Sequence, residues 1–495
     1  MFRSMPHSTP TPARQRDTRR LAAAALAAVA MAFTACTVGP DYRRPEVQAP
    51  AAWRIDYPRA ADVANTRWWE QFGDPVLGEL VETALQGNLD VRVAAARIDQ
   101  FIGTLGTVRS QFYPQLAYSG AASRSRASRV GQPPVPEPAD PYFTLYQAAL
   151  GASWQIDLFG RVRRLGEAAQ AQVYASEQAQ RGVVLTLVAG VATSYITLRG
   201  LDRQREIALA TAANFGETAR IFDLRFKSGI VSKTEVMQVR SQQQQALASI
   251  PVIEQQIAAV EGRISILLGR DPGPIPRGKT IDELVAPLVP ADLPSSLLER
   301  RPDILQAEQN LVAANASIGA ARALYYPSIA LTGLYGSTST AAGSFLRGPA
   351  TAWQAAASMT GPIFTFGAIE GQVRSAEAQK AQAELVYQSA ILNAFRDTND
   401  ALIGTQKTIE GVAFQRERVI ALRESARLSR LKFESGLIGY LEVLVADTDL
   451  FAAELALVGL TTDRYTQVVN VYQAMGGGWV DVADSMTPRP VGSIK

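Results

Sequence analysis

Residues 142–156 alternate between apolar and polar side chains, a pattern that predicts a β-strand with one dry and one wet face. The stretch reads "YFTLYQAALGASWQI", and glutamine, glycine and serine occupy most of the wet face. Aromatic residues at both ends of the apolar face are typical of a membrane barrel strand with a wet lumen, although a soluble sheet would also alternate. The apolar face carries Tyr142, Thr144, Tyr146, Ala148, Leu150, Ala152, Trp154 and Ile156.

Weaker versions of this pattern begin at residues 115, 328 and 350, so the chain supplies four candidate strands. An open four-stranded sheet cannot stand in lipid, because every backbone N–H and C=O must be paired there. Closing a barrel takes at least about eight strands. The strands must therefore come from several chains, and a threefold axis would give a trimeric barrel of twelve strands.

Residues 161–227 and 368–434 each run without a proline, between an "FG" turn and a "F-x-SG" turn. As continuous helices they would each be about 100 Å long, which suits a tube across the periplasm better than a compact domain. The helices that return from these turns carry heptads. One seam comprises Val236, Val239, Ala246, Ile250, Ile253, Ile257, Val260, Ile264 and Leu267, and another runs from Leu441 to Tyr472.

In the second returning helix a further set of apolar positions lies near a second seam, which predicts a neighbour on each side, as in a closed ring of helices. The alternative to a closed ring is that these positions form the core of a helical bundle.

The uncharged residues 182–198 could be mistaken for a transmembrane helix. Their partner stretch contains Arg396, Asp397 and Asp400, so we expect both stretches to be buried in the helical wall.

One sequence pattern occurs twice in the chain. "FDLRFKSGIVSKTEVMQVRSQ" at Phe222 returns as "SRLKFESGLIGYLEVLVADTD" at Ser429, and related segments recur along both halves. This self-similarity predicts two structural repeats.

The repeats divide the chain into six segments. We expect a signal peptide at 1–35, a lipidated extended segment at 36–73, a first repeat at 74–270, a connector at 271–286, a second repeat at 287–478 and a C-terminal tail at 479–495.

The first 35 residues have the layout of an export signal, with an Arg-bearing start and then the apolar run "LAAAALAAVAMAF". The run ends in "TAC", so the lone Cys36 resembles the acylated cysteine of a bacterial lipoprotein; the alternative is an unmodified thiol. Thr37, rather than Asp, follows the cysteine, which resembles the sorting signal for the outer membrane.

The net charge of +3 comes from the signal peptide, so no basic field remains to bind nucleic acid. His7, the only histidine, leaves with the signal, and Cys36 would be blocked by lipid. That removes Ser-His-Asp and Cys-His catalysis and the usual zinc sites, while carboxylate chemistry stays open. We expect no enzyme, no catalytic residue, no metal and no cofactor other than the covalent lipid.

The stretch "RPDILQAEQNLVAANASIGAARALYYPSIALTG" resembles the signature of the outer-membrane factor (TolC-like) family. "CTVGPDYRRP", "RWWEQFGDPVLGELVETAL" and "DLFGRVRRLGEAAQAQ" resemble its NodT-type lipoprotein branch. The resemblance implies a mainly α fold with a membrane β part, in which a trimeric twelve-stranded barrel continues as a periplasmic α-helical barrel. It also implies an efflux duct served by a periplasmic adaptor (membrane fusion protein) and an inner-membrane transporter of the RND type, with outer-membrane lipid around the barrel.

The resemblance places the repeated turns at the periplasmic tip, where the adaptor would contact Ser228, Gly229, Ile230, Ser435, Gly436 and Leu437. It also implies that rings of acidic and bulky residues close the pore just inside the turns. The matching positions are Glu235, Leu441, Glu442 and Val445. Relatives commonly have Asp at the position of Val445, so a carboxylate ring is missing there. For Glu442 the alternative is an exposed acid at a helix N-terminus.

The sequence therefore favours a passive exit duct whose closed tip is opened by the adaptor. A barrel protein for adhesion or protein secretion is the alternative, and a carboxylate-based hydrolase is a third. An adhesin would place its mass in long extracellular segments, whereas the connections between the strands are short here.

Overall fold

The computed structural model describes residues 37–46, 67–131, 134–289, 297–477 and 486–487. The predicted signal peptide, Cys36 and nearly all of the predicted C-terminal tail lie outside these residues. The chain divides into two compact units. One contains residues up to 44 with 101–173 and 310–384, and the other contains 45–100, 174–309 and the chain from 385 onward.

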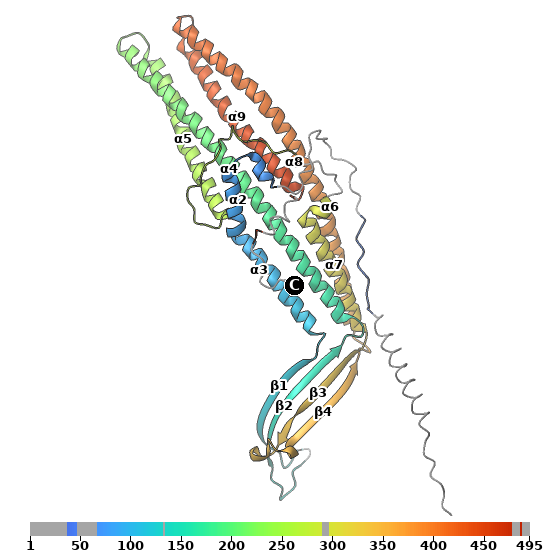
Figure 1. The fold of residues 1–495 in the computed structure, drawn as a ribbon. Helices are drawn as coiled ribbons and strands as arrows, with labels where there is room; N and C mark the ends of the chain where they lie inside the picture. Colours follow the sequence, from blue (N-terminus) through green and yellow to red (C-terminus); the bar gives the residue numbers. More distant parts are fainter. Residues whose placement is uncertain (1–36, 47–66, 132–133, 290–296, 478–485, 488–495) are drawn as a thin grey trace, which may run out of the picture. The chain divides into compact units, whose positions relative to one another are not determined.

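The first unit contains one antiparallel sheet in the order β1-β2-β3-β4, which forms a single curved layer (Figure 1). The predicted strands are confirmed, although β1 extends further than its apolar pattern. The strands are β1 (Gln115–Arg126), β2 (Tyr142–Ile156), β3 (Ser328–Ser339) and β4 (Thr351–Thr360). Both outer strands, β1 and β4, have one edge without a partner within the described chain.

Four long helices form two hairpins. α4 (Arg161–Lys227) returns as α5 (Lys233–Leu267), and α8 (Ala368–Glu434) returns as α9 (Tyr440–Ala474) (Figure 1). The bounds of α4 and α8 are those predicted from the sequence. Both helices have 67 residues, and both returning helices have 35. α5 stays one helix through Pro251.

Shorter helices precede the strands. They are α2 (Pro75–Gly87), α3 (Leu89–Ser110), α6 (Leu297–Arg300) and α7 (Pro302–Arg322), with 3-10 turns at Trp68–Phe72, Ala323–Tyr325, Ala342–Ser344 and Gly348–Ala350. The order of helix, strand, strand, long helix and returning helix thus occurs twice along the chain.

The core of the second unit forms around the uncharged middle of α4. Val188, Val191 and Tyr195 are fully buried beside Trp68 and Phe72 of the first 3-10 turn. Among the described helices α4 is long and apolar enough to cross a membrane, but 61% of the apolar window is buried inside the protein. This confirms that the apolar stretch is buried inside the protein, while its place in a wall of helices stays a prediction.

The predicted seam of α5 is also confirmed. Seven of its positions are buried, and Ile257 and Leu267 pack against the core from partly buried positions. On α9 the seam that starts at Leu441 is buried at Leu444, Val458, Tyr465, Val469 and Tyr472. Leu441 itself is 55% exposed. The first turn of α9 therefore presents an apolar side chain that this chain does not cover.

Candidate functional site

The two faces of the sheet differ in polarity, as the alternation predicted. Cross-strand partners share a face, so the row Tyr118–Leu150–Tyr335–Trp353 crosses all four strands on one side. The row Ala117–Gly151–Leu334–Gln354 lies on the other side. The first face also carries Trp154, Leu331 and Met359, whereas the second is rich in Ser, Thr, Gln and Gly.

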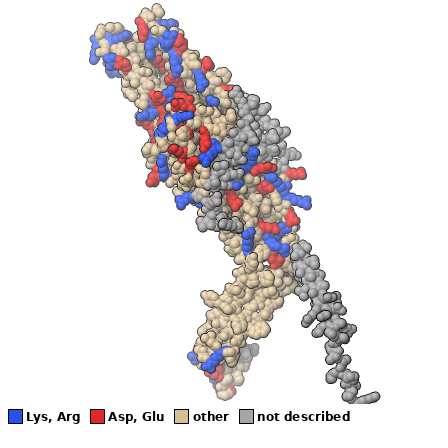
Figure 2. Space-filling view, viewed as in Figure 1, with Lys and Arg blue, Asp and Glu red and all other residues tan. Residues whose placement is uncertain are grey.

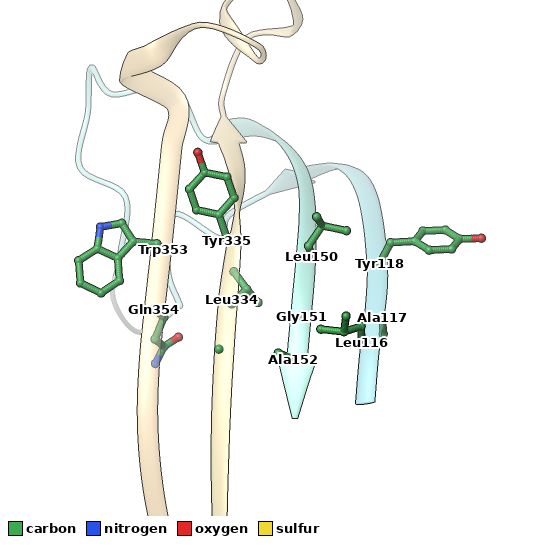
Figure 3. Close-up of a pocket in the computed structure, with 11 residues that line it drawn as sticks. Leu116, Ala117, Tyr118, Leu150, Gly151, Ala152, Leu334, Tyr335, Trp353 and Gln354 are labelled. Carbon is green, nitrogen blue, oxygen red and sulfur yellow. The ribbon is translucent and has the colours of Figure 1, made fainter. Parts of the chain in front are cut away.

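The apolar face is open. Tyr118 is 89% exposed, Trp353 75% and Met359 70%. In Figure 3, Tyr118 and Trp353 point away from each other at the two edges of the sheet, with Tyr335 and Leu150 between them. A shallow pocket of 670 Å³ on the sheet is lined by the eight residues of these two rows and by Leu116, Ala152 and Gly333 of the next row. Large aromatic groups on an open sheet face are stable in lipid, where water is absent.

Charge is also excluded from most of this surface. β2, β3 and β4 contain no Asp, Glu, Lys or Arg, and β1 contains only Arg124 and Arg126 at its end. Figure 2 shows an uncharged sheet with charged side chains gathered at the end where the β1–β2 and β3–β4 connections lie. An apolar, uncharged band with polar residues on the opposite face matches the wall of a membrane barrel.

In the second unit, the turns between α4 and α5 and between α8 and α9 have the same geometry. Gly229 and Gly436 have φ of 71° and 73°, which favours glycine because it lacks a Cβ atom. Ile230 N donates to Arg225 O at 2.9 Å and Gly229 N to Phe226 O at 2.9 Å, the hydrogen bonds of a Schellman motif. The second turn repeats them: Leu437 N donates to Lys432 O, and Gly436 N to Phe433 O, both at 2.9 Å.

These turns are accessible. Ile230 is 71% exposed and Leu437 75% exposed, and a Cβ added to Gly229 or Gly436 would meet nothing within 4 Å. Ser228 and Ser435 donate their hydroxyl protons back to the carbonyls of Leu224 and Leu431. The six predicted contact residues therefore lie in two turns, three in each. Each turn is held by backbone hydrogen bonds and exposes one apolar side chain, Ile230 or Leu437.

The predicted gate residues have two different environments. Glu235 forms a capping box with Ser232: its carboxylate accepts from Ser232 N at 2.8 Å, and Ser232 Oγ accepts from Glu235 N at 3.3 Å. α9 has Gly439 at the equivalent N-cap, which has no side chain to form such a box. Glu442 accordingly makes no side-chain hydrogen bond or ion pair within the described chain, and it is exposed together with Leu441 and Val445.

An aromatic cluster holds the two hairpins together near their turns. Phe222 of α4 lies 4.3 Å from Tyr440 of α9 between ring centroids, and Phe433 of α8 lies 5.1 Å from Tyr440. The Arg225 guanidinium stands over both phenylalanine rings, at 6.0 and 5.8 Å. Burial among these groups raises the pKa of Tyr440 above its ordinary value. The sequence analysis did not find this cluster, because its members do not occupy equivalent positions in the two copies.

Each hairpin is also closed by an ion pair, and the two pairs have opposite polarity. Asp223 accepts from Arg240 at 2.6 Å between α4 and α5, whereas Arg430 donates to Asp447 at 3.0 Å between α8 and α9. Burial raises the pKa of Asp447, and Arg430 partly offsets this. The second pair lines a groove of 580 Å³ between α4, α8 and α9, where Arg423 and Arg427 pair with Glu454 and Glu424.

The residues that follow Cys36 are fixed against the start of α4. Arg164 is buried and donates to Asp41 at 2.8 Å, and Val38 N donates to Phe159 O at 3.2 Å. A Cβ added to Gly39 would lie 2.4 Å from the Cα of Gly319 in α7. The segment 37–46, called the strap below, therefore packs directly on that helix. The quoted motifs "CTVGPDY" and "DLFGRVRR" supply both sides of this contact.

A buried carboxylate organises the connector between the two copies. Asp74 caps α2 by accepting from Val76 N at 3.0 Å, and it also accepts from Tyr195 Oη at 2.7 Å and Lys279 N at 2.9 Å. Burial and the hydrogen bond to Asp74 raise the pKa of Tyr195.

Two tyrosines of α9 also hold the connecting segment. Tyr465 and Tyr472 donate to Leu284 O and Leu288 O at 2.6 and 2.5 Å. Among the described residues, no group of three or more His, Cys, Asp or Glu is arranged to hold a metal ion.

A sequence model of the outer membrane efflux protein family matches residues 80–270 and 293–477. The chain belongs to this family. It is 33% identical over 468 residues to the probable efflux pump outer membrane protein TtgC of Pseudomonas putida, an alignment that covers 92% of this chain and 95% of TtgC. It is 29% identical over 450 residues to the probable outer membrane lipoprotein SilC of Salmonella typhimurium, covering 90% and 96% of the two chains.

The fold agrees with that of solved channels. The open state of the Neisseria gonorrhoeae MtrE outer membrane channel superposes with a TM-score of 0.80 at 28% identity, covering 90% of this chain and 99% of MtrE. Membership confirms the predicted family, location and function: this is an outer-membrane efflux channel.

Proposed function

We propose that this channel is a homotrimer whose three four-stranded sheets close one twelve-stranded barrel, continued by a helical barrel through the periplasm. The two halves of the chain would then be structural repeats that give the tube sixfold pseudo-symmetry. The observation that carries the proposal is the apolar row of Tyr118, Leu150, Tyr335 and Trp353, on a sheet whose two edges have no partner among the described residues. Such a sheet is stable in lipid only if neighbouring chains complete the wall.

The proposed duct performs no chemistry and serves an inner-membrane transporter of the RND type through a periplasmic adaptor. Ile230 and Leu437 are the contact points that the structure supports best, because each stands exposed on a rigid Gly turn. The alternative of an adhesin or secretion barrel is disfavoured by the short connections at 127–141 and 340–350. TtgC is named as a probable efflux pump outer membrane protein and SilC as a probable outer membrane lipoprotein, and both names are consistent with this proposal.

We further propose that Cys36 carries the lipid anchor. The strap at residues 37–46 supports it, because Arg164 and Asp41 fix the chain just after the cysteine beside the end of β2. A lipid on the preceding residue would enter the membrane next to the periplasmic rim of the barrel. Acyl chains contribute about 0.8 kcal/mol per buried CH2, so several chains would anchor the segment firmly.

The proposed gate is centred on the first turns of α9. Leu441 and Val445 are one helical turn apart and are 55% and 53% exposed, and Glu442 has no partner within the described chain. Three copies around the axis would form an apolar ring with a ring of carboxylates beside it. Glu235 lies near the same level, but its carboxylate is engaged in the cap of α5, so we assign it mainly to holding that turn.

The gate proposal is tested by conductance of the purified protein in planar bilayers. We expect Leu441→Ala to raise the resting conductance at least severalfold, because it widens the apolar ring, and Glu442→Ala to change cation selectivity. Ile420→Ala is the matched control, since Ile420 of α8 is 52% exposed but lies away from the turn. Conductance and selectivity equal to those of the unsubstituted channel in both α9 variants would contradict the assignment.

A further inference from the structure

Two arginines stand at the end of β1 on the apolar face of the sheet. Arg124 lies opposite Thr144 and Arg126 opposite Tyr142, in the same alternating set as Tyr118 and Leu150. Both guanidinium carbons lie over the ring of Tyr142, at 5.6 and 5.7 Å from its centroid. Two cations therefore share one aromatic platform on the side of the wall that faces lipid.

Neither arginine has an acidic partner in the described part of the chain. The nearby Glu137 pairs with Arg129, and Asp140 accepts from the backbone N–H of Tyr142 at 3.0 Å. The cation–π contacts hold the guanidinium groups in place but leave their N–H donors open. Two like charges held side by side repel each other, and this repulsion is relieved when an anion binds between them.

The position of the pair along the strand sets its depth in the membrane. Arg124 follows Leu116 by eight positions, or roughly 26 Å along a strand that rises about 3.3 Å per residue. A tilt of about 40° reduces this to roughly 20 Å along the membrane normal, close to the height of about 25 Å of the apolar band in such barrels. The arginines thus stand where the uncharged part of β1 ends.

We propose that Arg124, Arg126 and Tyr142 bind the phosphate group of a phosphorylated glycolipid in the outer leaflet. This inference rests on the proposed barrel, which places the β1–β2 connection at the cell surface. The planar guanidinium forks bind phosphate oxygens in pairs, and the tyrosine ring suits the membrane interface. The acyl chains lie along the apolar face below, toward Tyr118 and Leu116. The trimer carries three such sites.

Native mass spectrometry of the full-length trimer tests the proposal. The protein is stripped of lipid in detergent and then mixed with lipid A bearing its phosphates, with the same lipid after removal of the phosphates, or with inorganic phosphate. We expect the trimer to retain phosphorylated lipid A at least tenfold better than the dephosphorylated form, and to retain no inorganic phosphate. Equal retention of the two lipids, or retention of inorganic phosphate alone, would overturn the lipid site.

Variants locate the site. The double variant Arg124→Gln/Arg126→Gln is expected to lose the preference for phosphate, and Arg124→Lys/Arg126→Lys to keep part of it. Arg129→Gln/Arg347→Gln removes two charges from the same end of the barrel, away from the Tyr142 ring, and serves as the control. An unchanged preference in the double glutamine variant would refute the assignment.

The outcome for the barrel is separate from the outcome for the lipid. If trimers form and conduct ions but show no preference for phosphorylated lipid, only the lipid site fails. If the unsubstituted protein forms no trimer, the proposed barrel fails, and the lipid site fails with it.

Discussion

At the residue scale, Asp74 shows what the sequence could not predict. It precedes Pro75 and caps α2 by accepting from Val76 N. Its other two partners, Tyr195 and Lys279, lie more than a hundred positions away in the chain. No local pattern specifies a long-range hydrogen bond of this kind, because it depends on the packing of three separate segments.

We expect Asp74→Ala to destabilise the second unit. Asp74 is 2% exposed, and its loss would leave the buried Tyr195 hydroxyl and Lys279 N–H without an acceptor. Hydrogen bonds to a charged group are worth roughly 1.5–3 kcal/mol each, so losing these two should lower the free energy of unfolding by about 3–6 kcal/mol. Denaturation followed by tryptophan fluorescence measures this, because Trp68 and Trp69 lie in the same core.

Asp90→Ala is the control for this substitution, since Asp90 is exposed in the first turn of α3. It should change the unfolding midpoint only slightly. Equal midpoints for Asp74→Ala and Asp90→Ala would show that the buried network does not support the fold.

At the element scale, the boundaries of the long helices were predicted correctly because strong local signals mark them. An "FG" turn precedes each helix, and a glycine with positive φ ends each, at Gly229 and Gly436. The strands were found because alternation survives even in short segments. The aromatic cluster around Tyr440 and the strap on Arg164 were missed, since both join segments whose proximity depends on the tertiary fold.

The hairpin of α8 and α9 should respond to mild acid through Asp447. Burial raises the pKa of this carboxyl above its ordinary value of 3.8, so the folded hairpin binds the proton more tightly than the unfolded chain. The resulting stabilisation is complete below pH 3.8 and is lost as the pH rises through the folded pKa. The unsubstituted protein should therefore gain stability relative to Asp447→Asn on going from pH 7 to pH 4.

Thermal denaturation of both proteins at several pH values measures this difference, because shifts from other titrating groups cancel between them. Arg240→Gln, in the reversed ion pair of the other hairpin, provides a comparison in which Asp447 is intact. If Asp447→Asn and the unsubstituted protein lose stability in parallel at every pH, the burial of Asp447 has no energetic consequence.

At the scale of the whole molecule, the sequence predicted an outer-membrane efflux channel, and family membership confirms it. The proposed closure of the barrel is inferred from the four-stranded sheet, which has one apolar face and two edges without a partner in the described chain. One chain cannot display the contacts that complete it. The physical requirement that backbone groups in lipid be paired is what connects the single sheet to an assembly.

The most direct test of this assembly is disulfide cross-linking between the free edges. One cysteine replaces Ala121 of β1, and a second replaces, in turn, Ala352, Gln354, Ala356 or Ser358 of β4. The order of the sheet separates these strands within one chain, so a bond between them must join neighbouring subunits. We predict that at least one pairing yields a covalent trimer under oxidation in outer membranes, whereas each single cysteine does not. Absence of a covalent trimer at every register would contradict the closed barrel.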